Sequence, residues 1–104
     1  MKRILNMKRY DTEKSEMIAK WDNGGHRRDF RRCEETLYRT RNGNWFLHGE
    51  GGPFSQYART CEAGRTKTDG EELIPFTVQQ AAAWLAEHDV KAFERHFPEK
   101  AQDA

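Results

Sequence analysis

The segment from Glu34 to Gly52 constrains the fold of this chain more than any other. It contains two runs rich in β-branched and aromatic residues, 36–40 and 45–48, and the pair Asn42-Gly43 lies between them. An Asn-Gly pair readily adopts positive φ, which suits a two-residue turn between paired strands. The sequence therefore predicts a β-hairpin over residues 36–48 with Asn42 and Gly43 in the turn.

This turn sets the expected pairing of the two strands, because Thr40 then faces Trp45 and each preceding residue faces the next one along. Side chains alternate across a strand, so the pairing predicts two faces. The inward face would carry Thr36, Tyr38, Thr40, Trp45 and Leu47, whose large apolar area contributes roughly 25 cal/mol per Å² on burial. The other face would carry Leu37, Arg39, Phe46 and His48. We interpret the second face as a contact surface with Arg39 over Phe46; the alternative is a face covered by the C-terminal helices.

The remaining pattern predicts more strands and two C-terminal helices. Residues 16–21 alternate like a strand, and residues 71–76 form a last strand at an edge because of Pro75. Pro53 would begin a short helix that reaches Cys61. A capping box at 77–80 opens a helix over 77–88, and Asp89 caps another over 90–97. The predicted fold class is α+β, with a small antiparallel sheet of about three to five strands packed against these helices.

The chain has 104 residues, which predicts a single domain over residues 1–104. Met1-Lys2-Arg3 is echoed by Met7-Lys8-Arg9, so residues 1–6 are predicted to be a flexible, dispensable extension, and residues 99–104 a flexible tail. No apolar run has the length of a membrane span or a signal peptide. We therefore expect a cytoplasmic protein without membrane contact, a monomer or a dimer, in which Cys33 and Cys61 are free thiols.

Charge is distributed unevenly along the chain although the formal net charge is +1. Residues 1–41 contain 12 Lys and Arg against 7 Asp and Glu, whereas residues 71–104 contain 3 against 7. The densest basic run is the segment 26–32, HRRDFRR. Arginine beside an aromatic side chain can neutralise phosphates and stack on bases. The alternative for this run is a solvated loop or edge strand with Arg28 and Arg31 near Asp29, Glu34 or Glu35. The candidate nucleic-acid contacts are Arg27, Arg28, Arg31, Arg32, Arg39 and Arg41.

Metal and catalytic motifs are weak. His26, Cys33, His48 and Cys61 supply metal-ligand types, but their spacings match no zinc module, so we expect no metal site and no cofactor. His48 and Glu50 point to the same side of a continuing strand and could act as an acid–base pair, which gives a small enzyme as one hypothesis. The Gly49–Gly52 segment lacks the P-loop and Rossmann spacings. The sequence thus favours a protein that is not an enzyme.

A resemblance extends over most of the chain. The segments Tyr10-Asp11-Thr12-Glu13, 35–40 (ETLYRT), 43–52 (GNWFLHGEGG) and 70–75 (GEELIP) before a helix are similar to a family of small uncharacterised bacterial proteins carried on plasmids, prophages and other mobile elements. Some small proteins in such settings are anti-CRISPR proteins, which inhibit a CRISPR effector or its complex. The resemblance transfers no catalytic residue.

These observations give three hypotheses. The leading one is a non-enzymatic binding module of a mobile genetic element or phage that inhibits a host protein or ribonucleoprotein through protein–protein interaction, as an anti-CRISPR protein does. Its contacts would be Arg39, Phe46, His48 and the Gly49–Gly52 loop with Glu50. Either the Arg27–Arg32 segment or the acidic C-terminal helices would steer the approach. The alternative is a nucleic-acid-binding accessory protein that uses the basic segment Arg27–Arg41. The third is the enzyme based on His48 and Glu50.

Overall fold

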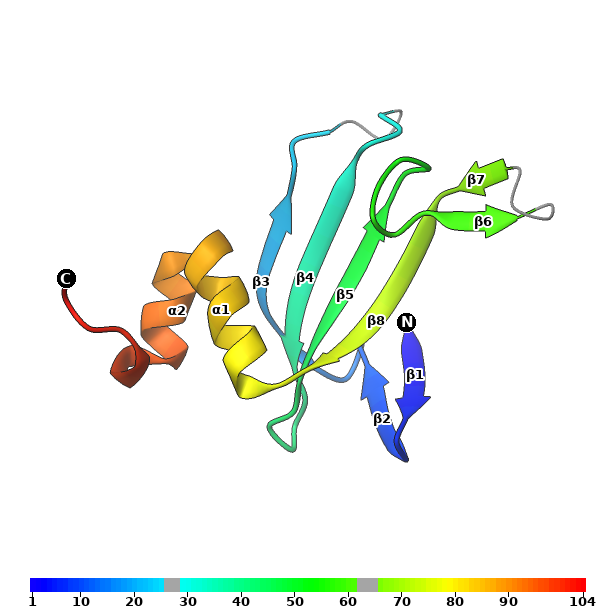
Figure 1. The fold of residues 1–104 in the computed structure, drawn as a ribbon. Coiled ribbons are helices and arrows are strands. Elements are labelled where there is room, and N and C mark those ends of the chain that lie inside the picture. Colours follow the sequence, from blue (N-terminus) through cyan, green and yellow to red (C-terminus); the bar gives the residue numbers. More distant parts are fainter. Residues whose placement is uncertain (26–28, 62–65) are drawn as a thin grey trace.

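The computed structural model describes residues 1–25, 29–61 and 66–104. Within them the chain forms strands first and helices last (Figure 1). The strands are β1 (Lys2–Leu5), β2 (Lys8–Asp11), β3 (Glu16–Asp22), β4 (Cys33–Arg39), β5 (Trp45–Gly51), β6 (Arg59–Cys61), β7 (Thr66–Thr68) and β8 (Gly70–Phe76). The helices are α1 (Val78–His88), α2 (Val90–His96) and the short 3-10 helix η1 (Pro98–Lys100). The predicted α+β class is confirmed.

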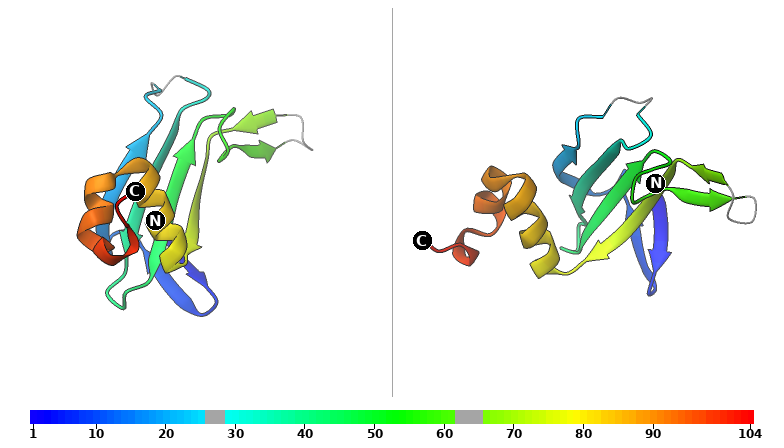
Figure 2. Two further views of the ribbon diagram at one scale, coloured as in Figure 1. Left: turned by 60° about the vertical axis from the view of Figure 1, so that its left-hand side comes forward. Right: turned by 45° about the horizontal axis from the view of Figure 1, so that its top comes forward.

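A four-stranded antiparallel sheet in the order β3-β4-β5-β8 forms the centre of the structure. Strand β8 lies at an edge, as Pro75 predicted, because proline cannot donate to a neighbouring strand. Helices α1 and α2 lie together on one side of the sheet, and the β1–β2 and β6–β7 hairpins extend from its two ends (Figures 1 and 2).

The hairpin β4–β5 forms, but the predicted register is wrong by one residue. Arg39 pairs with Trp45 and Tyr38 with Phe46, because the loop has three residues, 41–43, between Thr40 and Asn44. The Thr40 N–H donates to the Asn44 carbonyl over 2.7 Å, and Gly43 takes the left-handed conformation with φ +83°. A three-residue loop with glycine in that position is the next most common hairpin connection after the two-residue turn.

The slip moves the side chains of β4 to the face opposite to the predicted one, since side chains alternate along a strand, whereas Trp45 and Leu47 of β5 stay on the inward face. Leu37, Trp45 and Leu47 point towards the helices, on what we call the helix face, and pack there with Ala81, Ala82, Leu85 and Phe97. Tyr38 and Phe46 point to the opposite side, which we call the outer face. The predicted grouping of Tyr38 with Trp45 and Leu47 is therefore wrong.

The β1–β2 hairpin covers part of the outer face. Phe46 is fully buried there with Tyr10 and Leu73, and half-buried Leu5 and Tyr38 pack against them. The Tyr38 ring stacks on Phe46 at 5.1 Å between centroids, while Tyr10 meets Phe46 edge-on. Residues 1–6, predicted to be a dispensable extension, thus contribute a paired strand and Leu5 to this second cluster.

Local signals place the helix ends well. Thr77 and Gln80 form the predicted capping box, and Asp89 caps α2 through the N–H of Ala92. The buried side of α1 differs slightly from the predicted stripe, because Val78 is exposed while Trp84 is buried. In this orientation of α1 the Trp84 indole N–H faces the sheet and donates a hydrogen bond to Glu35, which is described below.

The helix predicted from Pro53 to Cys61 is wrong. Residues 52–58 form turns and residues 59–61 form β6. Strand β5 also continues through Gly49 to Gly51, so most of the Gly49–Gly52 segment is strand. The close packing of the turn segment on this strand explains both, because a Cβ at Gly49 would lie 2.0 Å from the Tyr57 ring. Glycine leaves the room that Tyr57 occupies.

Candidate functional site

A pocket with several basic side chains is lined by the β4–β5 loop, the β1–β2 hairpin and the turn before β3. The loop and the hairpin lie at the same end of the sheet (Figure 1). Its volume is about 570 Å³ and its wall includes Asp11, Ser15, Thr40 and Asn44. Five cationic residues line this pocket and an adjoining one: Lys8, Arg9, Lys14, Arg39 and Arg41. We call the surface formed by these five residues the basic pocket. Residues from three separate stretches of the chain, 7–11, 14–16 and 39–44, meet here.

Positive charge is in excess at this pocket. Its nearby carboxylates are Asp11 and Glu16, and Asp11 accepts a hydrogen bond from the backbone N–H of Glu13. Among the residues that the structure describes, none of the five cations forms an ion pair with a carboxylate within 4.0 Å. A concave surface lined by one sign of charge focuses the potential and attracts anionic groups.

The predicted contact residues do not form one surface. Phe46 is fully buried, so it is no contact residue in this structure. Arg39 is exposed on the side opposite Phe46, and its guanidinium lies 5.5 Å from the Trp45 ring instead of over Phe46. His48 and Glu50 share the outer face, away from Arg39.

The predicted arginine run is divided. Arg27 and Arg28 lie outside the described residues. Arg31 is exposed, whereas Arg32 is half-buried and forms an ion pair with Asp69 over 2.8 Å. Arg32 thus has a carboxylate partner, although it is the distant Asp69 and not one of the neighbouring carboxylates that the sequence suggested.

An exposed aromatic pair marks the other end of the sheet. Phe30 and Phe54 are 59% and 64% exposed, and their rings meet edge-to-face at 5.6 Å. The backbone N–H of Phe54 donates to the Phe30 carbonyl over 2.7 Å. This contact ties the turn segment after β5 to the loop before β4.

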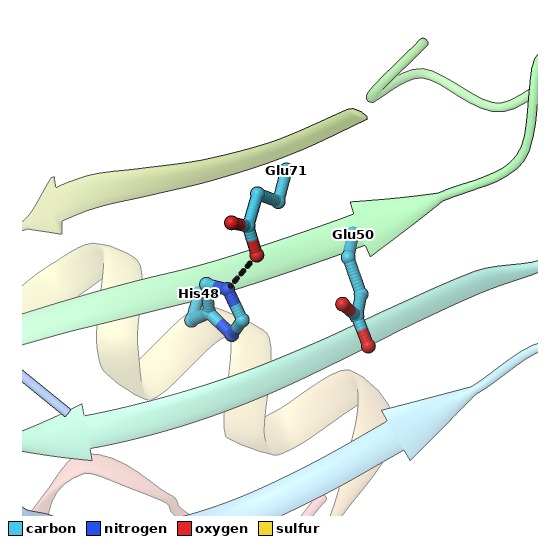
Figure 3. Close-up of side chains that lie close together, drawn as sticks. All are labelled: His48, Glu50 and Glu71. Carbon is cyan, nitrogen blue, oxygen red and sulfur yellow. Dashed lines mark hydrogen bonds and ion pairs between the residues drawn. The ribbon is translucent and has the colours of Figure 1, made fainter. Parts of the chain in front are cut away.

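A compact polar cluster occupies the uncovered part of the outer face. His48 and Glu50 are two residues apart on β5, and Glu71 lies opposite Glu50 on β8. His48 Nε2 lies 3.1 Å from Glu71 Oε2, and one donor atom from each of the three residues lies within 4.8 Å of the others (Figure 3). The sequence predicted that His48 and Glu50 point to one side, but it gave no sign of Glu71.

The surroundings of Glu50 in this cluster shift the pKa of its carboxyl group. Burial raises the pKa of Glu50 above its ordinary value, and the hydrogen bond to Glu34, its charge and that of Glu71 raise the pKa further, while His48 lowers it. A shallow depression beside the cluster is also lined by Arg32, Arg59 and Asp69. Carboxylates therefore crowd together here despite two nearby guanidinium groups.

The buried carboxylate of Glu35 on the helix face was missed from the sequence. It accepts hydrogen bonds from the Trp84 indole over 3.0 Å, from the Gln56 amide over 2.9 Å and from the Tyr57 hydroxyl. Burial, with the hydrogen bond to Glu35 and its charge, raises the pKa of Tyr57 well above its ordinary value. A buried carboxylate needs hydrogen-bond donors of this kind. We therefore interpret this network as structural: it holds the sheet, the turn segment and helix α1 together.

Comparisons with protein-family models, curated proteins and solved structures found no match to this chain. Among the described residues, no helix has both the length and the apolar character needed to cross a bilayer.

Proposed function

We propose that this chain is a non-enzymatic binding module of a mobile genetic element that binds and inhibits a host ribonucleoprotein, as an anti-CRISPR protein. The observation that carries the proposal is the basic pocket, with five cations and no ion pair among the described residues. The mobile-element setting rests on the resemblance of the sequence described above.

The pocket suits an anionic backbone that a partner presents in a fixed shape. Lysine and arginine side chains bind phosphates, and a phosphate contact fixes orientation more than sequence. The formal net charge of the chain is only +1, so attraction depends on this local surface and not on the whole molecule. A folded ribonucleoprotein offers both exposed phosphates and protein surface around them.

Direct binding of free nucleic acid is the second candidate function. Arg39 and Arg41, which belong to the predicted basic segment, also belong to the pocket, so the same observation favours it. The two functions differ in partner. An inhibitor of a ribonucleoprotein binds the assembled complex more tightly than its RNA, whereas a nucleic-acid-binding protein shows the same affinity for both.

Matched triple variants test the role of the pocket. Lys8→Ala/Lys14→Ala/Arg41→Ala removes three pocket cations, and Lys67→Ala/Lys91→Ala/Lys100→Ala removes three exposed cations elsewhere. Both variants lose the same charge, so a general electrostatic effect would weaken them equally. We expect the pocket variant to bind the partner complex at least about tenfold more weakly and the control to bind normally. Equal affinities for the two variants would contradict the proposal.

Inhibition itself requires a cellular assay. Expression of the wild-type protein should protect a phage from CRISPR targeting, and the protein should co-purify with effector subunits. The pocket variant should lose both properties while the control variant keeps them. If neither property is found across several CRISPR types, the anti-CRISPR assignment fails.

A further inference from the structure

We infer that His48, Glu50 and Glu71 form a binding site for a divalent transition-metal ion, and that Zn²⁺ is the ion the donor set fits best. This inference goes beyond the proposed function and does not depend on it, because it concerns a different part of the molecule. It rests on the convergence of three ligand-type side chains from two paired strands (Figure 3).

The strand pairing holds the three side chains on one face. His48 and Glu50 project to the same side of β5, because side chains alternate along a strand and residues two apart share a face. Glu71 is the direct cross-strand partner of Glu50, which places it diagonal to His48. Both strands belong to the central sheet, so the backbone positions of the ligands are fixed by its hydrogen bonds.

The distances suit a small ion. Zinc binds imidazole nitrogen and carboxylate oxygen at about 2.0–2.2 Å, so neighbouring ligand atoms around a tetrahedral ion lie roughly 3.3 Å apart. The 3.1 Å between His48 Nε2 and Glu71 Oε2 matches this spacing. The ligand atoms all lie within 4.8 Å of one another, so binding of the ion requires a rotation of a glutamate side chain to bring them closer. Three protein ligands leave the fourth position for water or another small ligand.

The chemistry of the donors selects the class of metal. Imidazole with carboxylate suits zinc and neighbouring transition metals, whereas Mg²⁺ and Ca²⁺ prefer oxygen ligands alone. A cation here also relieves the repulsion among the carboxylates of Glu34, Glu50 and Glu71. Arg32 and Arg59 at the margin oppose a cation only in part, because Asp69 pairs with Arg32.

The other histidine and cysteine side chains that the structure describes lie elsewhere. Cys33 is buried, and its position in β4 places it on the helix face. His88 packs against Trp21 and Trp84, and His96 packs against Trp45, so both also belong to the helix side. The cluster on the outer face is therefore separate from them, and variants can distinguish it.

Zinc titration of the full chain by calorimetry tests the site. We expect one Zn²⁺ per chain. The single variant His48→Ala and the double variant Glu50→Gln/Glu71→Gln should each bind Zn²⁺ at least about tenfold more weakly. Loss of a residue that only orients a metal ligand already costs about that much, and loss of the ligand itself costs no less. A matched control is Glu72→Gln, which lies beside Glu71 on β8 with its side chain on the other face. Two further controls, Cys33→Ser/Cys61→Ser and His26→Ala, remove alternative zinc ligands. The controls should bind as wild type does.

A measurement on the unaltered protein removes any dependence on variant folding. Addition of one equivalent of Zn²⁺ should shift the imidazole ¹⁵N resonances of His48 and leave those of the other histidines in place. The inference is overturned if wild type binds no Zn²⁺ at about 1 mM, if His48→Ala binds as tightly as wild type, if a cysteine or His26 variant loses binding, or if the shift appears on another histidine.

Discussion

Replacement of Glu35 by alanine tests the polar network that fastens α1 and the turn segment to the sheet. The change leaves the Trp84 indole and the Tyr57 hydroxyl, both on buried residues, without their acceptor. Each buried donor without a partner costs roughly 1–3 kcal/mol, and loss of the buried charge offsets part of that cost. We expect the free energy of unfolding to fall by about 2–4 kcal/mol and the melting temperature by roughly 10–25 °C.

Urea denaturation of a small set of variants measures this effect. Glu35→Gln keeps an acceptor oxygen and should lose only about 1 kcal/mol. Glu35→Ala combined with Trp84→Phe should show a coupling of about 1.5–3 kcal/mol, the range for a hydrogen bond to a charged group. The reasoning would be refuted by a Glu35→Ala protein within about 1 kcal/mol of wild type, or by effects that add to within about 0.5 kcal/mol.

Three further predictions concern stability. Burial raises the pKa values of Cys33, Tyr38 and Tyr57, so these groups keep their protons to a higher pH in the folded state than in the unfolded state. The free energy of unfolding should therefore fall as the pH rises above about 9–10. Equal urea midpoints at about pH 8 and 10.5 would argue against this. Gly49→Ala places a Cβ against Tyr57 and should cost about 1–3 kcal/mol by thermal denaturation, whereas an unchanged melting temperature would contradict the packing. A chain that begins at Met7 loses β1 and Leu5 and should fold with about 1–2 kcal/mol less stability; full stability would instead support the sequence-based prediction that residues 1–6 are dispensable.

The sequence predicted the fold class and the helix ends because their signals are local. The capping box at Thr77 and Gln80 and the cap at Asp89 each depend on residues within one turn. The hairpin register could not be predicted with the same success, because Asn42-Gly43 fits both a two-residue turn and a three-residue loop. One residue of difference placed Tyr38, and not Arg39, beside Phe46. The burial of Phe46 depends instead on the β1–β2 hairpin, which brings Tyr10 against it.

The candidate sites depend on pairing between distant segments. His48 and Glu71 are 23 residues apart and meet only because β8 pairs with β5 in one particular register. Lys8 and Arg9 join Arg41 only because the β1–β2 hairpin folds towards the end of the sheet. Patterns within short stretches of the sequence predict neither the contact of His48 with Glu71 nor the approach of Lys8 and Arg9 to Arg41. The pair His48 and Glu50 was visible, since alternation within one strand is sufficient to place both on one face.

The salt dependence of binding to a guide-loaded CRISPR effector complex tests the basic pocket most directly. Each phosphate contact contributes about 0.7–0.9 to the slope of log affinity against log salt concentration. Removal of Lys8, Lys14 and Arg41 should therefore lower the slope by about 2–3, while removal of Lys67, Lys91 and Lys100 should leave it at the wild-type value. Equal slopes for the wild type and the pocket variant would contradict an anion-binding role for this pocket.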